Sequence, residues 1–511
     1  MSRSGTFRPA SLPRLLLIGL VALLLIGVDR PAAATAISTL PALPDETAFT
    51  DTSFARPGFE FISTPFLSRT RYLLALDVDW PNGKINGQAR VLFVNRTPDT
   101  LKAILLRLYP NHPVTPATGT PLAHLRMTIR TLTLNGQPVS WTVGDRYQTT
   151  LTVPLTTPLP PGGTVQIDTT YTVIYPPPAD QLDGLETFPM LAVYQDGGWR
   201  TDISTKGLDY IFSETALYAV TLRAPNNVAL YAVGHVSTSA DTDGQHVIYQ
   251  IVTGPVRDFV YTLTRNWGNI PTQAGPIAVD VRYKGDPALA QEEATIAAQA
   301  MIYYDAHFGP YPYAKLTYLV LGFPSGGIQY PTLLYVDNAR DSNYRRFITA
   351  HEVAHEWFYG LLGNDPLRHA WLDESMAQIS LYLFYYDTYS PTVADAEWSH
   401  ILTWSQQVSG PHVVDTPVMQ FSDFSDYMAH TYGAGAVFMR QLLQKMGHDA
   451  FLAGISAYYK TAFLEIGTPQ QFLDAMQAQT PLTLAPLFCS GLGFGCSTAV
   501  TPGGTGSSSG Q

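Results

Sequence analysis

The sequence contains few cysteines and few charged side chains. Only 2 of its 511 residues are cysteine, and 14% are charged, against about 25% in an average soluble domain. Two cysteines cannot form the disulfide framework of so long a chain, so its stability must come from a large buried core. Hydrophobic residues make up 46% of the chain, which excludes intrinsic disorder.

Basic residues are also scarce. The chain has 30 Lys and Arg against 41 Asp and Glu, which gives a net charge of −11. Nucleic-acid binding needs a basic face to neutralise phosphates, so this balance argues against it. The length suggests about three domains, and fewer once terminal segments that do not fold are removed.

The N-terminal apolar run is too short for a membrane-spanning helix. It covers 14 residues, 15–28, whereas a span needs about 20. Arg3, Arg8 and Arg14 precede it and small residues follow, as in a secretory signal. We predict a signal peptide at 1–36, with an uncleaved membrane anchor as the alternative. In both cases the folded part lies outside the cytoplasm, whether secreted, periplasmic or membrane-anchored.

The C-terminal end, 483–511, is predicted to be a loop and a flexible tail. Residues 501–511 are rich in Gly and Ser. Cys489 and Cys496 lie just before them, and in an exported protein this spacing favours a local disulfide. Two thiols without nearby histidines would make an incomplete zinc site, the less favoured alternative.

The first half of the chain has the pattern of β-strands. Apolar residues alternate with polar ones before and after the turn pair Asn82-Gly83, which predicts a hairpin. We predict a β-sandwich or saddle domain at 69–272, after an arm at 37–68. Similar runs recur at 104–109, 148–153, 165–173, 218–222 and 259–264.

This half shows no metal-ligand spacing, phosphate loop or nucleophile elbow. We therefore interpret it as a structural or substrate-edge domain, with an independent sugar- or protein-binding module as the alternative.

The second half, 273–482, becomes mainly helical. Asp286-Pro287 caps a helical pattern that continues to Phe308, and an apolar strand follows at 316–321. The next helical pattern runs from 347 to 361 and contains the five residues His351-Glu352-Val353-Ala354-His355.

This five-residue motif predicts a zinc site. Two histidines four residues apart lie on one face of a helix, so both imidazoles can reach one zinc ion. Glu352 then lies beside the metal and can act as the base toward the attacking water. Glu374, after 18 intervening residues, offers a third, carboxylate ligand and leaves the fourth position free for catalysis.

Other polar residues lie close to this motif in the sequence. Tyr427 and Tyr432 precede an apolar helix at 436–446 that can direct a phenol toward the metal. Asp373 and His369 are either groups that orient the ligands or solvated turn residues.

The sequence resembles the gluzincin aminopeptidases, the family of aminopeptidase N, in a short form without the large helical C-terminal domain of many relatives. The resemblance covers most of residues 70–480. Its motifs are His351-Glu352-Val353-Ala354-His355-Glu356-Trp357-Phe358, Trp371-Leu372-Asp373-Glu374, Tyr432-Gly433-Ala434-Gly435-Ala436, Phe308-Gly309-Pro310-Tyr311-Pro312 and Leu106-Arg107-Leu108-Tyr109-Pro110-Asn111.

The resemblance implies an α+β protein with a saddle-shaped β domain and a thermolysin-like catalytic domain. It implies one Zn²⁺ per chain, bound by His351, His355 and Glu374, with Glu352 as the base. It also implies that Tyr432 stabilises the tetrahedral oxyanion, and that Tyr427 takes the place of a second active-site tyrosine.

The sequence departs from the family where the substrate's amino terminus is bound. The family has Gly-x-Met-Glu-Asn, and its glutamate pairs with the α-ammonium group; this chain has Gly326-Gly327-Ile328-Gln329-Tyr330. A neutral amide binds an ammonium group less strongly than a carboxylate does, so Gln329 should weaken the preference for free amino termini. Ala434 replaces a lysine that is usual in the family, and we have no physical account of that change.

We expect an exported, monomeric zinc peptidase acting on peptide or protein substrates, with membrane contact only if the N-terminal segment is uncleaved. An open cleft, without the C-terminal domain of many relatives, would admit longer substrates. Two alternatives stay open. One is an endopeptidase, or a zinc hydrolase of a non-peptide bond, on the same fold. The other is an inactive binding or scaffold protein.

Overall fold

The computed structural model describes residues 40–113, 126–204, 210–322, 326–338, 341–494 and 496. The expected signal segment and the Gly/Ser-rich tail lie outside these residues. Leu40–Gln511 form a single unit by their contacts. None of the helices in the described residues combines the length and the apolar character needed to cross a bilayer.

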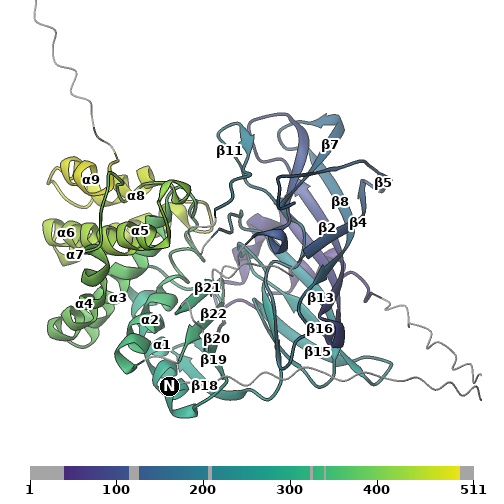
Figure 1. The fold of residues 1–511 in the computed structure, drawn as a ribbon, viewed down its shortest axis with the longest axis horizontal. Coiled ribbons are helices and arrows are strands. Elements are labelled where there is room, and N and C mark those ends of the chain that lie inside the picture. Colours follow the sequence, from purple (N-terminus) through teal and green to yellow (C-terminus); the bar gives the residue numbers. More distant parts are fainter. Residues whose placement is uncertain are drawn as a thin grey trace, which may run out of the picture. The chain divides into compact units, whose positions relative to one another are not determined.

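An eight-stranded sheet is the largest element of the first half (Figure 1). Its strand order is β15-β16-β13-β1-β2-β8-β4-β5. The strands are β1 (Arg71–Asp79), β2 (Lys84–Val94), β4 (Arg126–Leu134), β5 (Gln137–Pro138), β8 (Thr164–Ile174), β13 (Leu217–Pro225), β15 (His235–Ala240) and β16 (His246–Val252).

The hairpin predicted around Asn82-Gly83 is formed by β1 and β2. Alternate residues of β2 are buried, as its period of two predicts. The prediction of one inward face is wrong for β1, whose residues are buried on both faces, whereas β2, which also lies between two strands, keeps one partly exposed face. The connection is also longer than a two-residue turn, because the 3₁₀ turn η3 (Trp80–Asn82) precedes Gly83, whose φ is +59°.

Three smaller sheets complete this half, with strand orders β10-β3-β7-β6, β14-β17-β9 and β11-β12. Their strands are β3 (Leu101–Arg107), β6 (Thr142–Gly144), β7 (Thr150–Leu159), β9 (Gln181–Gly184), β10 (Met190–Leu191), β11 (Tyr194–Gln195), β12 (Gly198–Trp199), β14 (Ala229–Ala232) and β17 (Tyr261–Thr264).

The run that begins at Leu106 contacts two other segments of this half. Arg107 donates to the carbonyl of Arg200, and the Asn111 side chain exchanges hydrogen bonds with the backbone of Met127. These contacts connect the end of β3 to the first strand residues of β4 and to the segment after β12.

A five-stranded sheet forms the base of the second half. Its order is β18-β19-β20-β22-β21, so β21 is an edge strand. The sequence predicted that the first domain ends at residue 272. β18 crosses this boundary, so the first strand of the sheet contains residues from both predicted domains. The strands are β18 (Gly268–Ala274), β19 (Ile277–Tyr283), β20 (Lys315–Leu321), β21 (Gly327–Tyr330) and β22 (Leu333–Asp337).

Helices cover this sheet and continue to the C-terminal end (Figure 1). α1 packs against β18 and β19, and α2 packs against β21 and β22. The mixed α+β class predicted from the sequence is confirmed. The helices are α1 (Pro287–His307), α2 (Ser342–Ala354), α3 (Glu374–Thr388), α4 (Pro391–Ser405), α5 (Phe424–Tyr427), α6 (Gly435–Met446), α7 (His448–Ala462), α8 (Pro469–Gln477) and α9 (Ala485–Leu492).

An ion pair holds the N-terminal arm against α1, and a disulfide closes a loop near the other end of the described residues. The N-terminal arm carries the 3₁₀ helices η1 (Glu46–Thr50) and η2 (Glu60–Ser68), and Arg56 between them pairs with Asp305 of α1 at 2.9 Å. At the other end, Cys489 of α9 forms a disulfide with Cys496, as the sequence predicted.

Candidate active site

The helix that carries the histidines is shorter than the sequence pattern predicted. α2 ends at Ala354, and His355 follows it as the C-cap, still with helical φ and ψ of −66° and −16°. The chain then turns at Tyr359, whose φ of +122° is incompatible with a helix. Arg257 from the β-rich half donates to the Tyr359 carbonyl at 2.7 Å and so holds this turn.

The three predicted ligands converge. The Nε2 atoms of His351 and His355 lie 3.0 Å apart, and Glu374 Oε2 lies 3.3 and 3.5 Å from them. Glu374 is the first residue of α3, which packs against α2. All three side chains are buried, so the convergence lies inside the protein.

This donor set fits a zinc ion. Two imidazole nitrogens and one carboxylate oxygen are the usual three protein ligands of a catalytic zinc. Glu374 Oε2 is buried and receives no hydrogen bond that would satisfy its charge. A cation at the point where the three ligand atoms converge would satisfy it.

The electrostatics of the cluster support the same assignment. Burial disfavours the charge on Glu374, yet His355 and His351 hold the pKa of this carboxyl well below its usual range. His355 is also buried, and Asp373 and Glu374 nevertheless raise its pKa. The site is therefore arranged around carboxylate charge that attracts a cation.

Further polar groups hold the two imidazoles. His355 Nδ1 lies 2.5 Å from Asp373 Oδ1 and 3.0 Å from the Phe358 carbonyl. Burial lowers the pKa of His351, while Glu374 acts in the opposite direction, and the His351 ring stacks on Phe347. Contacts of this kind fix the orientation of metal-binding histidines.

Glu352 lies against the edge strand of the sheet. A Cβ atom at Gly327 would fall 2.1 Å from Glu352 Oε1, so only glycine leaves room for this carboxylate. Burial raises the pKa of Glu352 to about 8, and the charges of Glu374 and Asp373 add to the rise. A group whose pKa is near neutral can both take up and return a proton.

The same strand carries Gln329. Side chains two residues apart in a strand point to the same face, so Gln329 shares the face on which Gly327 meets Glu352. Gln329 is 5% exposed, and its Nε2 has no hydrogen-bond acceptor. Gly326, with φ +101°, lies just before the strand. The structure therefore brings all three predicted substrate-binding residues of this segment to the site.

Tyr432 lies on the opposite wall, in a π-helical turn, η7 (Met428–Ala434). Its ring stacks on His351 with centroids 6.0 Å apart. A Cβ at Gly433 would lie 2.5 Å from the Ser405 nitrogen, and one at Gly435 would lie 2.0 Å from Ser375 Oγ. The glycines of this motif therefore let the turn approach α4 and α3 closely.

Tyr427 takes a different position. Its ring meets the edge of the Tyr432 ring at 5.7 Å, and only 1% of the residue is exposed. It belongs to a small buried cluster with Ala370, Val418 and Phe421. The geometry thus shows Tyr427 packing against Tyr432.

Two sequence motifs that were recognised separately meet beside the site. Tyr311 donates to Glu356 Oε2 at 2.8 Å, and Trp357 Nε1 donates to the Gly309 carbonyl at 2.8 Å. These contacts anchor the end of α2 to the loop after α1. The sequence could not show this, because the partners are separated by about 45 residues.

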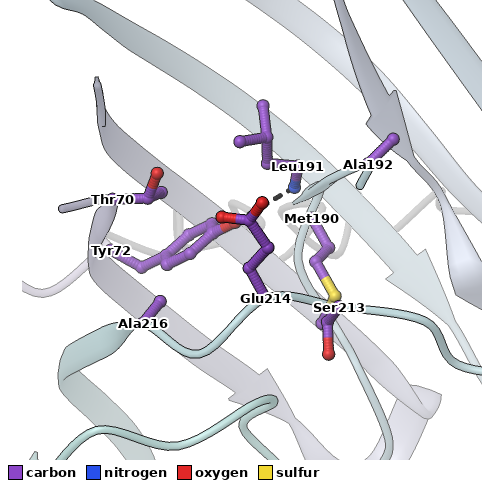
Figure 2. Close-up of a pocket in the computed structure, with 8 residues that line it drawn as sticks. All are labelled: Thr70, Tyr72, Met190, Leu191, Ala192, Ser213, Glu214 and Ala216. Carbon is purple, nitrogen blue, oxygen red and sulfur yellow. Dashed lines mark hydrogen bonds between the residues drawn. The ribbon is translucent and has the colours of Figure 1, made fainter. Parts of the chain in front are cut away.

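A small cavity of the β-rich half is not a comparable site. Tyr72, Met190 and Glu214 line it, and Figure 2 shows the Glu214 carboxylate beside the Tyr72 ring. Its volume of about 10 Å³ is the space of about one water molecule. A peptide cannot enter it.

Residues 293–489 match the family described as the peptidase family M1 domain. The matched residues include all three converging ligands, His351, His355 and Glu374.

Curated relatives match part of the chain. Aminopeptidase 2 of Candida albicans is 29% identical over 196 residues, which cover 34% of this chain and 21% of that protein. Aminopeptidase N of Streptomyces lividans is 30% identical over 131 residues, or 22% and 14% of the two chains. The chain therefore spans about a fifth or less of the length of these relatives.

Solved structures match the fold over a larger share of the chain. An M1 zinc metallopeptidase from Deinococcus radiodurans has a TM-score of 0.58 at 18% identity, and the match covers 80% of this chain and 90% of that one. A mutant of the Deinococcus enzyme bound to a Tyr-Ser-Ala substrate has a TM-score of 0.58 at 17% identity, covering 83% and 93%.

Proposed function

We propose that this protein is a zinc-dependent peptidase, aminopeptidase-like in its chemistry but altered in how it binds the substrate's amino terminus. The observation that carries the proposal is the convergence of His351, His355 and Glu374, whose ligand atoms all lie within 4.8 Å of one another, beside Glu352. The relatives named as aminopeptidases support the same activity.

His351, His355 and Glu374 would hold the zinc ion, which would supply Lewis-acid chemistry toward the substrate carbonyl and the attacking water. Glu352 takes the proton that the attacking water loses. The water oxygen bonds to the carbonyl carbon, the C–N bond breaks, and Glu352 returns the proton to the leaving nitrogen. The Tyr432 hydroxyl donates a hydrogen bond to the carbonyl oxygen as that oxygen gains negative charge.

Gln329 sets the altered recognition. The substrate's amino-terminal side lies along β21 at this residue, where only the amide oxygen of Gln329 can accept a hydrogen bond from an ammonium group. An amide lacks the charge that makes an ammonium–carboxylate hydrogen bond about twice as strong as a neutral one. The protein should therefore discriminate weakly between free and blocked amino termini.

A pair of peptides that differ only in N-terminal acetylation tests both the zinc peptidase activity and the role given to Gln329. We expect wild type to cleave both peptides, with rates within about tenfold of each other, and a zinc chelator to abolish both reactions. Gln329→Glu should raise the preference for the free peptide by about tenfold, and Gln329→Asn is the neutral control.

The outcomes separate the parts of the proposal. If no peptide is cleaved, or if the chelator has no effect, the zinc peptidase assignment is wrong. If the acetylated peptide is inert while the free one is cleaved, the role given to Gln329 is wrong. Cleavage of the acetylated peptide at internal bonds would favour an endopeptidase, the alternative that the neutral amide supports.

We also propose that the protein is exported. The disulfide between Cys489 and Cys496 supports this, because such bonds persist in oxidising compartments. The mass of the mature protein in its native host tests the proposal: we expect loss of the residues up to about Ala36. A full-length reduced protein in the cytoplasm would contradict it.

A further inference from the structure

A group of aromatic rings lies next to the site on two helices. Tyr344 and Phe347 of α2 face His400 and Trp404 of α4, and we call these four residues the aromatic wall. The Phe347 ring is 5.5 Å from His400 and 5.9 Å from Trp404, and Tyr344 is 6.0 Å from Phe347. Their spacing of three or four residues places them on one face of each helix.

The wall is continuous with the metal ligands and with Tyr432. Phe347 stacks on His351 with an interplanar angle of 10° and centroids 6.2 Å apart. Trp404 meets the Tyr432 ring edge to face at 6.0 Å. A substrate group lying against the wall would therefore lie beside the reacting carbonyl.

The other end of the wall meets the start of the edge strand. A Cβ at Gly326 would lie 2.5 Å from the Tyr344 hydroxyl, and one at Gly327 would lie 2.1 Å from Glu352. Gln329 follows two residues later. Along this edge, the order is therefore Gln329, then the catalytic base, then the aromatic wall.

The wall keeps surface available for contact. Phe347 is buried, but Tyr344, His400 and Trp404 are only half-buried. The charged side chains at the start of α2 already have partners. Asp341 caps the helix, Arg345 pairs with Glu292, and Arg346 pairs with Glu397. The wall therefore offers ring surface to an apolar group.

We propose that the aromatic wall is a subsite for a large aromatic side chain on the substrate residue that follows the scissile bond. The proposal rests on the proposed function. If the amino-terminal side of the substrate lies at Gln329 and its carbonyl at Glu352, the next residue reaches Tyr344 and Trp404. Edge-to-face and offset contacts with several rings favour an aromatic side chain over an aliphatic one of similar size.

Two peptide series test this subsite, one varied before the scissile bond and one varied after it, each with Phe, Leu, Ala, Lys and Glu. We expect kcat/KM for Phe after the bond to exceed that for Ala by at least about tenfold, and the series varied before the bond to show a smaller spread. The Phe/Ala ratio after the bond is the decisive quantity.

Substitutions in the wall should reduce this ratio. Trp404→Ala should reduce the Phe/Ala ratio by about tenfold, and Trp404→Phe should reduce it by less. Because Trp404 also contacts Tyr432, its loss could lower the rates for all peptides equally, but such a uniform loss would leave the ratio unchanged. His400→Ala is a second test of the subsite. The ring contacts of His400 in the wall are to Tyr344 and Phe347, so this variant changes the wall at a different place from Trp404. Phe61→Ala, at a ring 65% exposed on the N-terminal arm, is the matched control and should leave the ratio unchanged.

Collapse of the ratio in both wall variants, with the control unaffected, would support the subsite. An unchanged ratio, or a preference for Lys over Phe after the bond, would overturn it and leave the peptidase assignment standing. Failure of wild type to cleave any peptide would instead overturn the proposed function, and the subsite with it.

Discussion

Two clusters in this chain resemble each other as groups of potential metal ligands. His351, His355 and Glu374 form one, and Asp241, Asp243 and His246 form the other, at the turn between β15 and β16. In each cluster, the potential ligand atoms lie within 4.8 Å of one another. The difference between them lies in burial and in what already balances their charge.

The cluster in the β-rich half has a cation of its own. Arg223 lies 2.6 Å from Asp241 and 2.5 Å from Asp243, and it also pairs with Asp77 at 2.8 Å. His246 Nδ1 is 2.7 Å from the same guanidinium. This cluster is satisfied within the protein and stabilises a hairpin.

Among the described residues, no arginine or lysine pairs with the ligands of the cluster in the helical half. Its charge is balanced only by the two histidines themselves, and the oxygen shared by them receives no other donor. The comparison teaches that proximity of ligands does not by itself define a metal site. A buried set of ligands whose carboxylate is paired only with its fellow histidine ligands is the better candidate.

Removing a ligand from the buried cluster should have the largest effect. His355→Ala should lower bound zinc from about one ion per chain to less than about a tenth after dialysis, because two ligands hold zinc poorly. Metal analysis of purified protein measures this. Full retention of zinc in this variant would remove the distinction between the clusters.

Removing the internal cation of the hairpin cluster should affect stability and leave zinc unchanged. Arg223→Met removes one charged partner of the buried Asp77, which should cost about 2–3 kcal/mol in the free energy of unfolding. The Arg223 side chain is 17% exposed, which places the cost at the low end for a buried pair. Urea denaturation gives the value, and a change in zinc content would speak against the account.

Glu293 gives an intermediate case, a buried carboxyl with one distant cation. Arg345 Nε is 3.9 Å away, and burial raises the pKa of Glu293 to about 9, with Asp337 and Glu292 adding to the rise. The folded state therefore keeps a proton that the unfolded state releases above about pH 4.5. The contribution of Glu293 to stability should therefore be greatest below about pH 4.5 and fall by at most about 1.4 kcal/mol per pH unit up to about pH 9.

Glu293→Gln should remove this part of the pH dependence. Unfolding midpoints measured between pH 5 and 9 should then change less with pH than in wild type. Equal slopes in the two proteins would show that Glu293 is ionised in the folded state.

The smallest effect is expected at Asp241. Asp241→Asn removes one partner of Arg223 near the surface, where solvent screens ion pairs and they contribute little to stability. The urea unfolding midpoint should therefore change less than in Arg223→Met, with zinc content and activity as in wild type. A loss of zinc would make the hairpin cluster a second metal site.

The sequence predicted the class of fold and the ligands for physical reasons that can be named. The strand period and the turn pair at Gly83 predicted the β1–β2 hairpin, because both are local. The spacing of His351, His355 and Glu374 predicted one site, because helix geometry and metal chemistry together restrict it.

Other features depend on contacts between distant segments, which no local pattern encodes. The end of α2 at Ala354 depends on the turn at Tyr359, which is held by Arg257 about 100 residues earlier. The parallel pairing of β1 with β13 joins segments about 140 residues apart in the sequence. The π-helical turn around Tyr432 depends on the close approach of Gly433 to α4.

The central claim is that His351, His355 and Glu374 bind zinc while Glu352 moves the proton. The most direct measurement compares zinc content and peptide hydrolysis of Glu352→Gln with those of wild type. We predict about one zinc per chain in both proteins and a loss of at least about 10²-fold in kcat for the variant. Wild-type-like hydrolysis by the variant would contradict the account.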